Sequence, residues 1–183
     1  MEVSDTDITG LCVITPKAIE DERGMIREFY RESSWRESGL PSLGKWVQLN
    51  VTETRRGTVR GLHGEAMHKL VGLGSGEALG AYVDVRRNSP TFRTVVTVPL
   101  SVTTQVLVPE GVCNGFQPTS DGGCTYVYCF DHEWQVGMSG VAVNALDPAL
   151  GIDWPLPIDR DDPAAISAKD RSLPTLAELL GDT

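Results

Sequence analysis

The sequence lacks several features that mark large protein classes. Its 183 residues include only three histidines and four cysteines, and no two cysteines form a CxxC pair, so zinc knuckles and thioredoxin-like redox motifs are not supported. No apolar run approaches the roughly 20 residues that a membrane-spanning helix needs. The N-terminal MEVSDTDITG is acidic where a secretory signal would be basic and then apolar. We therefore expect no membrane association, a cytoplasmic location and reduced cysteines that mainly fill the core.

Positive charge is also scarce. The 16 Lys and Arg residues face 25 Asp and Glu, which gives a formal net charge of -9 and a pI near 4.8. This charge opposes binding to a nucleic-acid backbone, although a local basic pocket can still bind a small phosphate ligand. With 40% hydrophobic and 22% charged residues, the composition is that of one globular domain, here residues 1–183.

Short apolar runs rich in Val, Thr and Tyr, separated by Gly and Pro clusters, dominate the chain from about Trp46 to Val143. Helical periodicity is missing between them, so the pattern predicts an all-β sandwich or barrel, and a jelly roll is the natural choice. The expected strands are Lys45–Val51, Thr58–His63, His68–Gly74, Ala78–Val85, Thr94–Leu100, Gln105–Val108, Gly115–Gln117 and Thr125–Phe130. Short helices are expected at Ser33–Ser38 and at Leu173–Leu180, the latter with Pro174 near its first turn.

Two of the three histidines belong to an HxExxH pattern, His63, Glu65 and His68, in a predicted hairpin. His and Glu suit zinc or iron. However, strand alternation sends His68 to the other face, and no histidine near PEGVCNGF completes a ligand set, so we expect no metal site. Alternation also separates Arg60 from His63, and both can line one cavity only if Gly61 marks a bulge or twist.

Polar residues recur at alternate positions of three apolar strands. Gln48 and Asn50 share one face, as do Lys69 and Val71 on the second strand and Tyr126 and Tyr128 on the third. The pattern is typical either of a lined interior or of the solvent face of a half-exposed sheet, and alternation alone leaves both interpretations open.

Several motifs in sequence order resemble the dTDP-4-dehydrorhamnose 3,5-epimerase family. They are DERG, RGLH, KLV, VDVRRNSPTF, PEG and the late SAKD, and the resemblance spans nearly the whole chain. It implies a cupin-type jelly roll and an isomerase that acts on a nucleoside-diphosphate 4-keto-6-deoxyhexose. Such an enzyme inverts carbon 3, carbon 5 or both through an enolate, and this chemistry requires no redox cofactor.

The resemblance also implies roles for individual residues. His63 matches the catalytic base and Asp170 the carboxylate paired with it. Tyr128 matches the catalytic acid, and Tyr126, one pleat away, is the alternative. Lys69 matches the cation near the ketone. Asp84 matches a supporting acid, and Trp134 or Tyr30 is expected to stack on the nucleotide base. The positions that match substrate or nucleotide contacts are Arg23, Glu28, Gln48, Asn50, Arg60, Asn114 and Trp134.

Family members are dimers that exchange N-terminal strands, so the resemblance implies a homodimer in which Arg23 and Glu28 act across the interface. Strands within about 1–50 would form that interface, and the tail of about 150–183 would pack on the barrel. The chain also departs from the family pattern: Asn114 replaces a pocket histidine, and Gly64 and Glu65 replace an aromatic residue and a glutamine.

The alternatives left open are a 3,4-ketoisomerase of the same cupin class and a nucleotide-sugar binding module without turnover. Taken singly, each candidate also has a structural interpretation. Asp170 can pair with an arginine, Lys69 can be an ordinary strand lysine, and Tyr128 can be a core aromatic residue.

Overall fold

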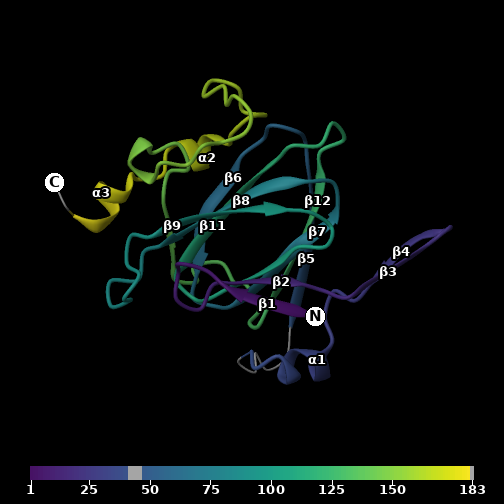
Figure 1. Cartoon of the computed structure of the whole chain (residues 1–183). Coiled ribbons are helices and arrows are strands. Elements are labelled where there is room, and N and C mark those ends of the chain that lie inside the picture. The colour runs from purple at the N-terminus through teal and green to yellow at the C-terminus, as the bar shows by residue number, and fades with distance from the viewer. Residues whose placement is uncertain (41–46, 182–183) are drawn as a thin grey trace.

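A computed structural model describes residues 1–40 and 47–181, and within them the main strands form two facing antiparallel sheets (Figure 1). The six-stranded sheet has the order β1-β2-β10-β7-β12-β5 and consists of β1 (Glu2–Asp5), β2 (Cys12–Thr15), β5 (Gln48–Thr54), β7 (Lys69–Ser75), β10 (Gln105–Val108) and β12 (Cys124–Phe130). The five-stranded sheet has the order β13-β6-β11-β8-β9 and consists of β6 (Arg60–Glu65), β8 (Ala78–Asp84), β9 (Val95–Leu100), β11 (Val112–Pro118) and β13 (Gly140–Ala142). The predicted all-β jelly-roll sandwich is confirmed.

The predicted strands match the observed ones with shifted ends. The strand expected from Lys45 is β5, which continues to Thr54, while Lys45 and Trp46 lie outside the described residues. The segment Gly115–Gln117 is the centre of the longer β11. The residue pattern did not delimit the N-terminal strands β1 to β4 or the short β13.

Both expected helices exist, α1 (Glu32–Glu37) and α3 (Leu176–Leu180), but the predicted start of α3 is wrong. Pro174 lies outside the helix, because Thr175 caps it: the Thr175 side chain accepts a hydrogen bond from the Glu178 backbone, and the Glu178 carboxylate accepts one from the Thr175 backbone. Two short elements, the 3₁₀ turn η1 (Pro148–Leu150) and α2 (Ala168–Arg171), were not predicted. No helix in the described ranges is long and apolar enough to cross a membrane.

Three hydrophobic clusters hold the layers together. The first lies between the two sheets and includes Val71 and Tyr126 from one sheet and Tyr82 and Phe116 from the other. The second covers the outer face of the five-stranded sheet with the C-terminal segment, and the third covers the outer face of the six-stranded sheet with α1, where Trp35 is fully buried. Because β7 is covered on both faces, its residues are almost all apolar.

Edge strand β5 is covered on one face only. Gln48, Asn50 and Thr52 are half-buried and face the sandwich interior, while Leu49 and Val51 are 59% and 58% exposed on the other face. This alternation decides between the two interpretations of the sequence pattern: the polar residues of β5 face inward and the apolar ones face solvent.

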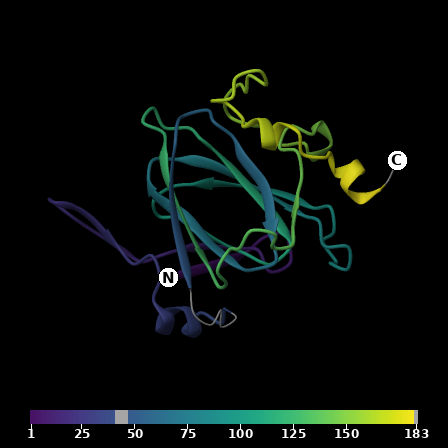
Figure 2. The same cartoon turned by 180° about the vertical axis from the view of Figure 1, so that it is seen from behind.

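A two-stranded arm, β3 (Ala18–Asp21) and β4 (Gly24–Arg27), extends away from the sandwich (Figures 1 and 2). Its base is attached to the barrel by Arg27, whose Nη2 donates to the main-chain oxygens of Leu73 and Gly74. Ile19 and Ile26 on the arm are 58% and 71% exposed. The arm therefore presents apolar side chains that the other described residues do not cover.

The C-terminal segment returns to the five-stranded sheet, where α2 and α3 lie along one side of the barrel (Figure 1). Leu176 and Leu180 are buried in the cluster on the outer face of that sheet. The Asp147 carboxylate accepts a hydrogen bond from the Leu176 backbone at 2.7 Å, and Val59 forms an isolated parallel bridge with Ile166. These contacts fix the segment that carries Asp170.

Gly61 is the point where strand β6 departs from regular alternation. His63 pairs with Asn114 and Arg60 pairs with Phe116, so three steps along β6 oppose two steps along β11. Gly61 has a φ of +110°, and a Cβ there would lie 2.7 Å from the main-chain oxygen of Asn114. This bulge turns Arg60 and His63 toward the same cavity, as the sequence required for a shared site.

We predict that Gly61→Ala lowers the free energy of unfolding by about 3 kcal/mol, because the new methyl group adds a backbone clash to an unfavourable positive φ. Gly151→Ala is the matched control. Gly151 also has a positive φ, of +61°, but no atom lies within 4 Å of the added Cβ, so its loss should be about 1 kcal/mol. Urea unfolding of both variants measures the difference, and equal losses would contradict the role given to the bulge.

Candidate active site

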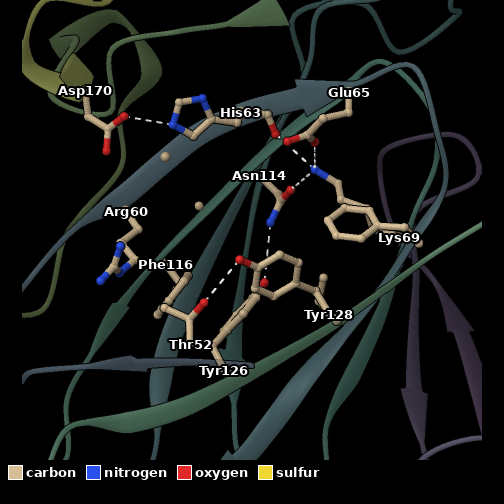
Figure 3. A pocket seen from close by; sticks show the side chains of 14 residues that line it. Thr52, Arg60, His63, Glu65, Lys69, Asn114, Phe116, Tyr126, Tyr128 and Asp170 are labelled. Atoms are coloured by element: carbon tan, nitrogen blue, oxygen red, sulfur yellow. Dashed lines mark hydrogen bonds and ion pairs between the residues drawn. The ribbon is translucent and has the colours of Figure 1, made fainter. Parts of the chain in front are cut away.

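A polar cavity of about 210 Å³ opens between the two sheets (Figure 3). The five-stranded sheet contributes residues of β6 and β11, the six-stranded sheet contributes residues of β5, β7 and β12, and α2 adds one carboxylate. Its lining consists of Thr52, Arg60, Gly61, His63, Glu65, Lys69, Val71, Asn114, Gly115, Phe116, Tyr126, Tyr128, Phe130 and Asp170. All four predicted catalytic residues therefore lie around one cavity, together with two of the predicted binding residues.

His63 and Asp170, which are 107 residues apart in sequence, form a hydrogen-bonded pair at the cavity. The distance from His63 Nε2 to Asp170 Oδ1 is 2.8 Å. Burial alone would raise the pKa of Asp170, but the hydrogen bond and charge of His63, with further bonds from Ser167 and the Gly61 backbone, lower it below its ordinary value. The ionised carboxylate accepts the Nε2 hydrogen, which leaves the lone pair on Nδ1.

Tyr128 lies on the opposite wall, on β12 of the six-stranded sheet, and Figure 3 shows its ring across the cavity from His63. Its hydroxyl is 3.1 Å from Thr52 Oγ1 on the neighbouring strand β5. Tyr126 lies deeper, stacked on Phe116 with ring centroids 3.9 Å apart. Burial raises the pKa of Tyr126 well above its ordinary value.

Lys69 is 3% exposed and its ammonium group reaches across the cavity from β7 to the other sheet. Nζ donates to the His63 main-chain oxygen at 3.1 Å and forms close contacts with Glu65 Oε2 and Asn114 Oδ1. Arg60 lies at the edge of the cavity, where its Nε donates to Thr54 Oγ1 at 2.9 Å. The site thus combines two cations with the carboxylates of Glu65 and Asp170.

Three predicted binding residues lie next to the cavity instead of lining it. Gln48 and Asn50 are the cross-strand partners of the lining residues Phe130 and Tyr128. The Gln48 side chain donates to Asn50 Oδ1 at 3.1 Å and accepts from the backbone nitrogen of Trp134 at 2.7 Å. These residues therefore extend the polar inner face of β5 beyond the cavity, and the half-exposed Trp134 indole lies at the same end.

Arg23, Glu28 and Tyr30 do not line this cavity within one chain. Arg23 is at the tip of the arm, 89% exposed and paired with Asp21. Glu28 pairs with Arg31. Tyr30 packs against Trp35, with ring centroids 5.5 Å apart. It does not line the chain's own cavity, so the expectation that it stacks on a base bound there is wrong.

The HxExxH pattern is divided between two places. His63 and Glu65 line the cavity, whereas His68 Nδ1 lies 3.1 Å from Asp131 outside it. Within the part of the chain that the structure describes, no three His, Cys, Asp or Glu side chains are grouped to hold a metal ion.

Asp84, expected as a supporting acid, does not reach the cavity. Its buried carboxylate accepts hydrogen bonds from Arg86, Ser89 and Thr91, and so holds the turn after β8. The interpretation of Asp84 as a group that supports the site is therefore wrong, because its oxygens are occupied by the residues of that turn.

The sequence interpretation missed the roles of Thr52 and Glu65. Thr52 follows Gln48 and Asn50 on the same face of β5, so the alternation that identified those two residues could have found it. Glu65 stood out only as a departure from the family pattern and as a rejected metal ligand. Its contact with Lys69 could be predicted only by knowing that β6 and β7 face each other across the cavity.

Comparisons with known proteins identify the family of the chain. The model of the dTDP-4-dehydrorhamnose 3,5-epimerase family matches residues 5–178. The chain belongs to this family. A dTDP-4-dehydrorhamnose 3,5-epimerase of Methanothermobacter thermautotrophicus is 35% identical over 183 residues, covering 94% of this chain and 93% of its own.

Two solved structures of the family are similar over nearly the full length. The epimerase of Legionella pneumophila, in complex with dTDP-4-keto-L-rhamnose, is 32% identical with a TM-score of 0.84, and 97% of this chain and 96% of that chain are covered. A 3'-monoepimerase of Streptomyces bikiniensis, in complex with dTDP-quinovose, is 33% identical with a TM-score of 0.82, covering 95% and 88%. The family thus includes proteins described as double and as single epimerases.

We predict that Asp84→Asn lowers stability at neutral pH by about 2 kcal/mol or more, and that this difference shrinks in acid. Burial would raise the pKa of Asp84, but its hydrogen bonds from Arg86, Ser89 and Thr91 outweigh burial and lower the pKa from 3.8 to about 2. A depressed pKa stabilises the fold above pH 4, and this contribution disappears as the pH falls from about 4 to about 2.

Urea unfolding at pH 7, 4 and 3 measures the effect. Asp121→Asn is the control. Asp121 is fully exposed and its ion pair with the exposed Arg56, at 3.5 Å, is a surface pair that contributes little, so this substitution should leave the stability unchanged at each pH. A loss for Asp84→Asn that stays constant with pH would contradict the assignment.

Proposed function

We propose that this chain epimerises a nucleoside-diphosphate 4-keto-6-deoxyhexose at carbon 3, carbon 5 or both. The observation that carries the proposal is the placement of an imidazole and a phenol on opposite sheets around one cavity, His63 on β6 and Tyr128 on β12. Inversion of a carbon requires removal of a proton from one face and its return to the other. Two facing sheets supply such a pair of groups.

The chemistry follows from the position of the ketone. Carbons 3 and 5 flank the carbonyl at carbon 4, so loss of either hydrogen as a proton leaves an enolate whose charge rests on the carbonyl oxygen. His63 takes the proton on Nδ1, because Asp170 occupies Nε2 at 2.8 Å and fixes that tautomer. Asp170 then stabilises the imidazolium that forms.

Tyr128 returns a proton to the other face of the planar carbon. Its hydroxyl is oriented by Thr52, 3.1 Å away on β5. Solvent then protonates the Tyr128 phenolate and accepts the proton that His63 gained. The reaction consumes no oxidant or reductant, since substrate and product have the same oxidation level.

The rest of the substrate fits the polar residues around the cavity. Arg60 at its edge offers a guanidinium for a diphosphate oxygen. Gln48 and Asn50 offer amides along β5, and Trp134 offers an indole surface for a base. Support for a dTDP-sugar comes from the related structures, which were solved with dTDP-linked sugars.

We place the enzyme in the cytoplasm. Cys12, Cys113, Cys124 and Cys129 are free and buried, and such thiols suit a reducing compartment.

Incubation with dTDP-4-keto-6-deoxyglucose in deuterated water should incorporate deuterium at carbon 3, carbon 5 or both, and NMR of the ring identifies which. His63→Ala should slow incorporation by about 10² to 10⁴-fold, because it removes the base. Tyr128→Phe should instead separate exchange from inversion: His63 still removes and returns protons on one face, so deuterium enters while the inverted product falls about 10²-fold or more.

Absence of exchange with every nucleoside-diphosphate 4-keto-6-deoxyhexose tested would overturn the proposed function. A 3-keto product would indicate a ketoisomerase instead. Binding without any exchange would indicate a binding module.

We further propose that the protein is a homodimer in which the N-terminal arm of one copy lies on the other. The arm exposes Ile19 and Ile26, and edge strand β5 exposes Leu49 and Val51 on its outer face. Exposed apolar surface of this kind marks protein interfaces. Arg23, which the family resemblance assigns to the site, lies on this arm and not at the chain's own cavity, which supports a contribution to the neighbour's site.

Sedimentation velocity should show a dimer, and Ile19→Lys combined with Ile26→Lys should shift it to monomer because charges replace the buried apolar contact. Val136→Lys is the control, since Val136 is 91% exposed and is not one of the arm residues 18–27. A wild-type monomer at micromolar concentration would refute the dimer without affecting the proposed reaction.

A further inference from the structure

The ammonium group of Lys69 is enclosed by acceptors from the opposite sheet. Nζ donates to the His63 main-chain oxygen at 3.1 Å, to Glu65 Oε2 and to Asn114 Oδ1. An ammonium group has three N–H bonds. The described residues therefore provide one acceptor for each of them, and the lysine has no N–H left to direct at a ketone oxygen in the cavity.

The contact with Lys69 fixes the orientation of the Asn114 amide. An ammonium can only donate, so the amide must turn Oδ1 toward it and Nδ2 away from it. Figure 3 shows Nδ2 pointing into the cavity, where its nearest polar partner is Tyr126 Oη at 3.4 Å. Because 3.4 Å is long for a hydrogen bond, this amide group can readily donate to an oxygen of a bound molecule.

Asn114 is also in the right place relative to the base. It is the direct cross-strand partner of His63, so the two side chains start from neighbouring positions on one wall. The oxygen that becomes negative is attached to the carbon next to the one that loses its proton. A donor to that oxygen must therefore lie beside the base, as Asn114 does.

The charge of Lys69 also acts on this amide. A cation on Oδ1 draws electron density from the amide and makes the Nδ2 hydrogens stronger donors, as in any chain of polarised hydrogen bonds. Glu65 pairs with the ammonium, and the side chains of Lys69 and Glu65 are 4% and 22% exposed. Pairing removes the large cost of burying a single charge and holds the lysine on the Oδ1 side of the amide.

We propose that Asn114 is the catalytic residue that donates, through Nδ2, to the developing enolate oxygen, and that Lys69 is a positioning residue acting through the Asn114 amide. This inference rests on the proposed epimerisation and revises the expectation that Lys69 itself contacts the oxygen. Glu65 and the His63 carbonyl keep the lysine in its place. The acceptor set of Lys69 and the direction of the Asn114 amide together carry the assignment.

Asn114→Ala distinguishes the two possible donors, because they predict opposite outcomes. If Asn114 is the donor, kcat for deuterium incorporation falls about 10² to 10³-fold, as for loss of one oxyanion donor, while KM changes by only a few fold. If Lys69 is the donor, removing Asn114 frees one of its N–H bonds, and kcat stays within about tenfold of wild type or rises. That second result would overturn the proposal.

Two further variants separate a catalytic effect from a loss of structure. Asn114→Asp keeps the shape and the acceptor for Lys69 but lacks the donor, so its kcat should fall at least as far as that of Asn114→Ala. Asn88→Ala, which removes an exposed amide in the turn after β8, is the control and should match wild type in activity. Thermal unfolding of all variants identifies any that fail to fold.

The role of Lys69 is tested by combining Lys69→Met with Asn114→Ala. A lysine that acts through Asn114 has little effect once the amide is gone, so the double variant should lie within a few fold of Asn114→Ala in kcat. Independent contributions would multiply, and a multiplicative loss would overturn the positioning role. Wild-type exchange is measured first: its absence refutes the proposed function, whereas wild-type exchange with an active Asn114→Ala variant refutes this inference alone.

Discussion

The 2.8 Å hydrogen bond between His63 and Asp170 connects the first part of the barrel with the end of the chain, and the rest of the site depends on it. It exists only because the C-terminal segment is fastened to the five-stranded sheet. The burial of Leu176 and Leu180, the Asp147 contact with the Leu176 backbone and the Val59–Ile166 bridge all serve to place α2. Packing far from the cavity thus determines the tautomer of His63.

The cavity places many polar groups inside a sandwich whose remaining interior is apolar. Such groups are tolerated when they satisfy one another. Asp170 is paired with His63, Glu65 with Lys69, and Tyr128 with Thr52, so the most buried charges have partners before any substrate arrives. The same pairs orient each group, which links the stability of the site to its ability to act without rearrangement.

Much of the architecture followed from local patterns, because strand alternation and Gly and Pro clusters act over a few residues. Alternation identified the polar face of β5 but left open whether that face points inward, and it showed that Arg60 and His63 can share a site only with a bulge at Gly61. The arm and α2 did not, since neither has a strong periodicity of its own. Asp170 and His63 were matched through the family resemblance, and no spacing rule could join residues 107 positions apart. The position of Lys69 against Glu65 and Asn114 depends on how two sheets face each other, which no single strand encodes.

The register of β5 against β12 limits the insertions and deletions that this strand can tolerate. Tyr128 opposes Asn50, and Thr52 lies two residues along. Since side chains alternate, one residue inserted into or deleted from the middle of β5 would bring its apolar residues inward and carry the polar ones beyond that point out to solvent. Inside β5, therefore, a single added or lost codon would replace the polar lining of the cavity with an apolar one.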